Sequence, residues 1–217
     1  MNPFESVPAD FTTAQWRNEP TQYVLQPECL RLTTAPGTDL WQRSFYGFQV
    51  DNAPALLWER CDNLTLTARA RFHYRQRFDQ CGLLVYIDPD HWLKVSIEYE
   101  DATHSRLGSV VTNRGYSDWA SSDIPTTTEH WYRLSRRGPD FLLEYSDDGR
   151  AFRQMRVCHL DGLGETTADM ARLPPEQLPA APIRIGVYAC SPQSSSFEAS
   201  FDHCSLIPSQ WHAHDAE

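Results

Sequence analysis

The sequence predicts an all-β protein, a β-sandwich of two antiparallel sheets, and three observations support this prediction. Apolar and polar residues alternate along most of the chain, while the 3.6-residue period of an amphipathic helix is almost absent. About a dozen alternating segments are separated by turn-forming residues, the pattern typical of a sandwich or barrel. Seven Trp, nine Tyr and ten Phe supply enough apolar volume for a sizeable core.

The strands are clearest in the middle of the chain. In residues 64–73, Leu, Ala and Phe on one face alternate with Thr, Arg and His on the other. The next strand has apolar residues at 83, 85 and 87 and ends at the turn 88–90. In residues 91–101, Leu, Val, Ile and Tyr occupy one face. The opposite face of that strand carries Trp92, Lys94, Ser96, Glu98 and Glu100.

Further strand pairs follow toward the C-terminus. Residues 131–152 are predicted to form a strand, a turn at 138–140, a second strand and a second turn at 147–149. Residues 183–187 and 197–201 alternate on either side of a serine-rich turn.

No repeat or linker divides the sequence. We therefore expect one domain over residues 1–217, with its core between about residues 11 and 208. The stretch 163–182, rich in Pro, Ala and Glu, is expected to form a loop insertion on the surface. At most one helical turn is predicted in it, around residues 175–178.

The composition argues against several classes of partner. The formal net charge is −10 at pH 7 and the longest basic run is Arg136-Arg137, so neither nucleic acid nor an anionic membrane is an expected partner. No apolar stretch approaches the roughly 20 residues that cross a bilayer, and residues 1–16 lack the features of a secretory signal. The six cysteines form no C-x-x-C pair, which favours reduced thiols and a cytoplasmic protein.

Lys94 is the only lysine among nineteen basic residues. It lies within residues 78–119, which are predicted to form three consecutive antiparallel strands. Since arginine serves as the general surface cation of this chain, a single lysine in mid-strand suggests a place that requires a compact ammonium group. Chance retention of a single lysine at this position is an equally good explanation.

Six segments, in this order, carry a resemblance to a known family. The sequence is similar to the regulation-of-enolase-like family, a domain-of-unknown-function family within the concanavalin A-like lectin/glucanase superfamily. The segments are TDLWQRSFYGFQVDN (38–52), FDQCGLLVYID (78–88), HWLKVSIEYED (91–101), GSVVTNRGYSDWA (108–120), YSDDGRAF (145–152) and IGVYACSP (185–192).

The resemblance implies a two-sheet jelly roll with a concave and a convex face. The superfamily is rich in sugar binders and glycoside hydrolases, but this family has no settled activity, so a carbohydrate ligand is an expectation by analogy. The sequence departs from the family pattern in having DNAP after the first segment, DQCG in the second and no Gly before IEY in the third. Loss of that Gly would narrow a groove at this point.

The polar face of the strand 91–101 is the first candidate site. Trp92 could stack on the apolar face of a sugar ring, and Lys94 and Glu98 could bind hydroxyl groups. Lys94 and Glu98 are about 13 Å apart along the strand, so each would pair with a neighbouring strand and not with the other. Cross-strand ion pairs that fix the register are the competing interpretation.

The segment 114–119 is the second candidate site, at the rim of the expected groove. Arg114 and Asp118 could bind hydroxyl groups while Trp119 stacks on a sugar; a structural corner with Trp119 in the core is equally plausible. Family position adds Tyr188, as well as Asp79 and Gln80, to the rim. Three aromatic residues of the first segment either line this groove or fill the core, and the core is favoured: Trp41, Tyr46 and Phe48.

The sequence gives only weak indications of glycosidase catalysis or of metal binding. Glu98 and Glu100 lie about 7 Å apart on one strand face, a separation suited to a glycosidase, but solvated acidic residues are the preferred interpretation. His203 and Cys204 give no tetrahedral metal site of the usual spacing, and the pair His212 and His214 falls in the C-terminal tail. The turn 88–90 could donate to a calcium ion, but this interpretation is disfavoured. We expect neither a metal nor a cofactor.

Three functions are therefore weighed. The first is a cytoplasmic module that binds a carbohydrate or sugar-like metabolite on the concave face, where Lys94 would suit a phosphate. The second is a glycoside-acting enzyme that uses Glu98 with Lys94 or Asp118; a strongly raised carboxylate pKa in the groove would favour it. The third is a regulatory protein-interaction domain in carbohydrate metabolism, which a filled groove and an exposed apolar patch would favour.

Overall fold

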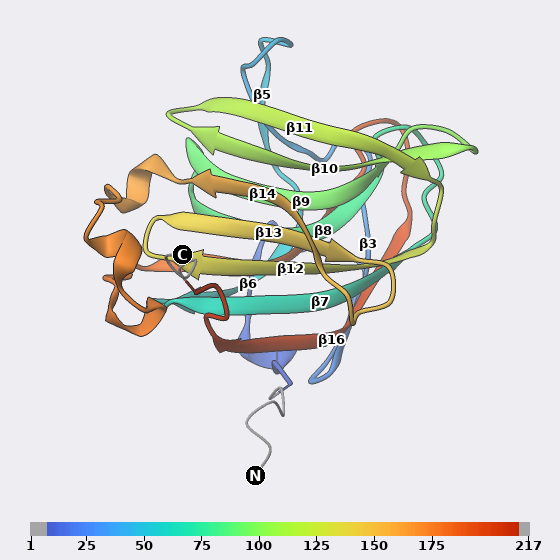
Figure 1. The fold of residues 1–217 in the computed structure, drawn as a ribbon. Helices are drawn as coiled ribbons and strands as arrows, with labels where there is room; N and C mark the ends of the chain where they lie inside the picture. The colour runs from blue at the N-terminus through green and yellow to red at the C-terminus, as the bar shows by residue number, and fades with distance from the viewer. Residues whose placement is uncertain (1–7, 213–217) are drawn as a thin grey trace.

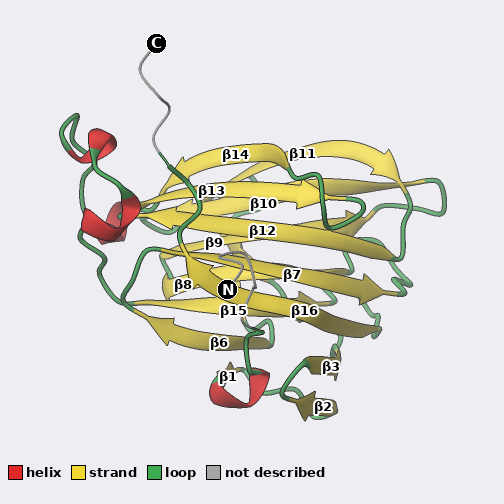
Figure 2. Ribbon diagram, turned by 60° about the horizontal axis from the view of Figure 1, so that its bottom comes forward, coloured by secondary structure: helices red, strands yellow, loops and turns green. Residues whose placement is uncertain are grey.

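The computed structural model, which describes residues 8–212, confirms the two-sheet β-sandwich (Figure 1). The first sheet, called the β9 sheet, is antiparallel and has the strand order β1 (Gln15–Arg17), β6 (Ala55–Arg60), β15 (Ile183–Cys190), β8 (Gln80–Asp88), β9 (His91–Tyr99), β10 (His104–Asn113) and β11 (Tyr116–Pro125). The second, called the β12 sheet, has the order β14 (Arg153–His159), β13 (Asp140–Ser146), β12 (Glu129–Arg137), β7 (Leu64–Phe72), β16 (Glu198–Pro208), β3 (Cys29–Thr33) and β2 (Tyr23–Gln26). The two layers lie face to face in Figure 2.

The middle of the β9 sheet has the predicted antiparallel order. β8, β9, β10 and β11 are adjacent, so residues 78–119 include the start of a fourth strand beyond the three predicted. Arg114 and Gly115 both have positive φ in the tight turn that begins this strand. Because β9 pairs with β8 and β10 in register, Glu98 lies beside Gln80 on one side and Arg106 on the other.

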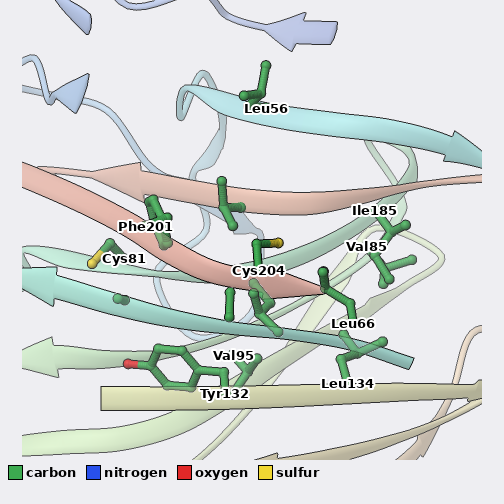
Figure 3. Packing of buried hydrophobic residues seen from close by; sticks show 14 of the residues in the cluster. Leu56, Leu66, Cys81, Val85, Val95, Tyr132, Leu134, Ile185, Phe201 and Cys204 are labelled. Carbon is green, nitrogen blue, oxygen red and sulfur yellow. The ribbon is translucent and has the colours of Figure 1, made fainter. Parts of the chain in front are cut away.

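The core between the sheets follows the predicted alternation (Figure 3). Val85 and Val95 of the β9 sheet pack toward Leu66 and Leu134 of the β12 sheet. The Tyr132 hydroxyl accepts a hydrogen bond from the backbone N–H of Ile97 at 2.8 Å, which joins the two sheets. The polar residues between these apolar positions therefore face outward, as predicted for 91–101.

The outer face of the β9 sheet is covered in part by a small hairpin. Its strands are β4 (Leu40–Gln42) and β5 (Gln49–Asp51), and its tip stands above β11 in Figure 1. Beneath it lies a second apolar cluster, separate from the core between the sheets. The cluster contains Leu40, Trp41, Ala53, Ala55, Leu57, Leu84, Tyr86, Trp92, Val110, Tyr188 and Cys190.

The stretch 163–182 contains two single 3-10 turns, Met170–Arg172 and Pro175–Gln177, where one was predicted. It is tied to the sandwich by polar side chains. Asn63 Nδ2 donates to the carbonyls of Pro175 and Leu178, and Arg137 Nη2 donates to the carbonyl of Leu173. All six cysteines have free thiols, and none of the helices in residues 8–212 is long and apolar enough to cross a membrane.

Candidate functional site

A pocket of about 430 Å³ lies between the outer face of the β9 sheet and the β4–β5 hairpin. This size is within the range of small-molecule sites. Its lining combines aromatic and charged residues from segments far apart in the sequence. The lining residues are Gly37, Asp39, Trp41, Tyr46, Phe48, Val50, Phe78, Gln80, Lys94, Glu98, Val110, Trp119, Pro192 and Gln193.

Lys94 connects the sheet to the hairpin at the base of the pocket. Its side chain is 4% exposed, and Nζ donates a hydrogen bond to the carbonyl of Leu40 at 2.9 Å. Nζ also lies 3.5 Å from Asp39 Oδ1, and the rings of Trp92 and Tyr188 are each 5.8 Å from it. The lysine therefore satisfies a backbone carbonyl and a carboxylate that the hairpin brings over the sheet.

Glu98 stands at the other end of the pocket base. Gln80 Nε2 donates to Glu98 Oε2 at 3.1 Å, while Gln80 Oε1 accepts from the hydroxyl of Tyr188. Glu98 Oε1 is buried and has no hydrogen-bond partner among the described residues. Burial raises the pKa of the Glu98 carboxyl to about 7; the Lys94 ammonium opposes this rise and the Asp39 carboxylate reinforces it.

A recess of about 10 Å³ adjoins the pocket beside Glu98. Gln80, Lys94, Glu98 and Trp119 line both spaces. This volume is close to the minimum that one water molecule requires. Since the recess has polar walls, it is suited to a water molecule hydrogen-bonded to the Glu98 carboxyl.

Aromatic rings form the walls of the pocket. Trp119, on β11, has the Arg106 guanidinium carbon 5.4 Å from its ring centroid and lines the pocket together with Phe78. The hairpin contributes Trp41, Tyr46 and Phe48. The expectation that these three fill the core is wrong for Tyr46 and Phe48, which are exposed at the pocket mouth.

Two of the predicted binding residues lie beneath the pocket and not in its lining. Trp92 is 0% exposed and its indole Nε1 donates to the carbonyl of Pro89, so it is not free to stack on a ligand. Tyr188 is also buried, and its hydroxyl reaches across β8 to Ser96 Oγ at 2.9 Å. Both residues contact side chains that do line the pocket: the Tyr188 hydroxyl donates to Gln80, and the Trp92 ring lies 5.8 Å from the Lys94 ammonium group.

Arg114 and Asp118 are outside the pocket, contrary to the prediction. Arg114 is in the β10–β11 turn, where it forms an ion pair with Asp161. Asp118 pairs with Arg156 of β14, on the β12 sheet, at 3.0 Å. Successive strand residues point to opposite faces, so Asp118 faces away from the pocket when Trp119 faces into it. Lys94, Glu98 and Trp119 are the predicted residues that the structure brings together.

We expect Asp118→Ala to leave both stability and ligand binding nearly unchanged. The Asp118 side chain is 72% exposed, so its pair with Arg156 is largely solvated and contributes at most about 1 kcal/mol. Thermal denaturation and calorimetry would measure the two quantities. A large loss of ligand affinity would contradict the face assignment of β11.

Asp39 was missed by the sequence analysis, and Gln80 was included only by family position. Asp39 precedes a strand of three residues and reaches Lys94 only because the hairpin folds back over the sheet. Gln80 could have been found from the register, since it lies directly across from Glu98. Residues 8–212 contain no group of three or more side chains that could hold a metal ion.

Comparison with known proteins identifies the family. The model of the family described as "Protein of unknown function (DUF1349)" matches residues 16–209. The chain belongs to this family. A protein of Saccharomyces cerevisiae named "Regulation of enolase protein 1" is 29% identical over 203 residues, 93% of each chain. The resemblance inferred from the six sequence segments is thereby confirmed.

Solved structures show the same fold. A functionally unknown protein from Saccharomyces cerevisiae matches with a TM-score of 0.79 and 26% identity, covering 94% of this chain and 100% of that one. The GH43 BlXynB protein from Bacillus licheniformis matches with a TM-score of 0.67 and 16% identity, covering 92% of this chain but 38% of that one. At the second identity the similarity shows the sandwich fold alone.

Proposed function

We propose that this protein binds a neutral sugar or a sugar-like metabolite in the pocket between the β9 sheet and the β4–β5 hairpin. The observation that carries the proposal is the composition of the lining. Aromatic walls of Trp41, Tyr46, Phe48 and Trp119 enclose a base with polar side chains. Aromatic faces suit the C–H faces of a pyranose, and the base offers donors and acceptors for its hydroxyl groups.

The charges at the base favour a neutral ligand over a phosphate ester. Lys94 is the one cation among the described lining residues, and it is already engaged by Asp39 and by the carbonyl of Leu40. Glu98 adds a second acidic group nearby. A phosphate would lie between two carboxyl groups with no free cation, whereas sugar hydroxyls can donate to both.

The comparisons support a role in carbohydrate metabolism. The name of the yeast relative refers to the regulation of enolase. Among the structural neighbours, a protein from Bacillus halodurans is described as a xylan beta-1,4-xylosidase. A position on the concave face, a cytoplasmic location and a protein partner belong to this proposal as predictions.

Isothermal titration calorimetry tests the proposal directly. We expect at least one neutral sugar to bind, and Trp119→Ala to weaken binding by about tenfold or more, which corresponds to about 1.4 kcal/mol. Asp118→Ala is the matched control, since it alters the neighbouring residue on the opposite face. Tighter binding of sugar phosphates than of the parent sugars would contradict the neutral-ligand proposal.

A second candidate is an enzyme that transfers a proton at the sugar, and Glu98 favours it. A carboxyl group with a pKa of about 7 can act as a general base or acid near neutral pH, and the adjoining recess suits a reacting water molecule. If the protein is an enzyme, Glu98→Gln should lower turnover of aryl glycosides by about 100-fold or more while sugar binding persists. If the wild type binds sugars but does not turn over aryl glycosides, the enzymatic function is excluded and the binding function is retained.

A further inference from the structure

Three exposed aromatic residues gather at the tip of the β4–β5 hairpin, and one of them, Phe45, is the most exposed large hydrophobic residue within residues 8–212. Phe45 is 95% exposed, and Tyr46 and Phe48 are about half exposed. Tyr116, in the neighbouring β10–β11 hairpin, is also exposed and lies under the Arg43 guanidinium at 5.8 Å. Such a concentration of exposed apolar rings usually marks a binding surface.

The loop at this tip is held in a fixed shape. Arg43 and Phe45 have φ values of +56° and +62°, a region that non-glycine residues rarely adopt. Backbone hydrogen bonds join Arg43 to Phe48 and Gly47, and Arg43 Nη1 donates to the carbonyl of Gly115 at 2.7 Å. The strain is therefore imposed by the surrounding contacts, and its result is that Phe45 is presented to solvent.

These rings continue outward from the pocket. Trp41 lies inside it, and its ring centroid is 5.5 Å from that of Tyr46. Tyr46 in turn is 5.5 Å from Phe48, with nearly parallel rings, and 4.9 Å from Phe45. Trp41 and Phe45 each meet Tyr46 edge to face, at interplanar angles of 71° and 78°, so the contacting rings form a continuous aromatic track from the pocket to Phe45.

We propose that the ligand is a linear oligosaccharide, with one end in the pocket and its next units stacked along the aromatic track as far as Phe45. This inference rests on the proposed function and extends it from a single sugar to a chain. Two features of the molecule favour a saccharide over another occupant of the patch. Tyr46 and Phe48 belong to both the pocket and the patch, and the net charge of −10 opposes self-association.

The test is a chain-length series measured by calorimetry. Gluco-, malto-, manno- and xylo-oligosaccharides are titrated from the monosaccharide to the hexasaccharide into the wild type, Phe45→Ala and Val24→Ala. Val24, on β2, is an exposed apolar control outside the pocket lining. For at least one series, affinity should rise with length before it levels off. Phe45→Ala should lose about five- to tenfold of that gain in affinity, the size of one aromatic contact, while its affinity for the monosaccharide stays at the wild-type value. Val24→Ala should bind every chain length with wild-type affinity.

The outcomes separate this inference from the function on which it rests. A monosaccharide that binds as tightly as its oligomers would overturn the oligosaccharide inference and leave the pocket proposal intact. A length dependence that Phe45→Ala does not change would overturn the role of the track. If no saccharide of any length binds, the proposed function fails and this inference with it. Concentration-dependent dimers of the wild type, lost in Phe45→Ala, would instead assign the patch to a second copy.

Discussion

Replacing Lys94 with alanine is expected to lower the free energy of unfolding by about 3 kcal/mol. The ammonium group is nearly inaccessible and serves the Leu40 carbonyl and the Asp39 carboxylate. Removal leaves both groups under the hairpin without this partner, which costs far more than loss of an exposed ion pair. Urea denaturation followed by tryptophan fluorescence measures the change.

Two further variants separate charge from packing at this position. Lys94→Met keeps the side-chain stem between the Trp92 and Tyr188 rings but removes the charge. Its free energy of unfolding should therefore fall by most of the amount lost in Lys94→Ala. Adding Asp39→Asn should recover part of the loss, because a buried pair that is removed as a whole leaves no unpaired charge. If Lys94→Ala is as stable as the wild type, Lys94 does not anchor the hairpin.

Glu98→Gln is expected to raise stability at alkaline pH and to leave it unchanged at acidic pH. The pKa of this carboxyl is about 7 in the folded protein, against an ordinary value of 4.5. Between these values the folded protein holds a proton that the unfolded chain has lost, so the wild type loses stability as pH rises through this window. At about 1.4 kcal/mol for each pKa unit, the amide should gain up to about 3 kcal/mol at pH 8.

The measurement is urea denaturation of both proteins from pH 4 to pH 8. The stability difference between variant and wild type should be near zero at pH 4 and grow as pH rises. Glu165→Gln, at an exposed position in the 163–182 loop, controls for removal of any carboxylate. A difference that stays constant across the range would show that Glu98 does not titrate between these values.

Strand alternation was enough to predict which residues face outward from the β9 sheet. It placed Lys94 and Glu98 on one face, and the same rule, applied to 118 and 119, would have excluded Asp118. Alternation cannot predict what covers an outer face. That cover is the β4–β5 hairpin, whose strands have three residues each and are too short to leave a periodic signal.

The burial of Trp92 could not be predicted for the same reason, because alternation does not show what covers the outer face. It shares a face with Lys94 and Glu98, yet the hairpin buries Trp92 and leaves an opening over the other two. Tyr46 and Phe48 illustrate the converse, because the turn between two short strands presents them at the mouth of the pocket. Both outcomes depend on long-range contacts such as the one between Lys94 and Leu40.

The seven tryptophans allow the central claim to be tested in one experiment. In a ¹H–¹⁵N spectrum, the indole N–H signals are followed during titration with a neutral oligosaccharide. We predict that the Trp41 and Trp119 signals shift together and saturably, because both rings line the pocket. The signal of Trp131, on the opposite sheet, should stay in place. A shift at Trp131 with none at Trp41 or Trp119 would contradict the claim and move the binding site to the β12 sheet.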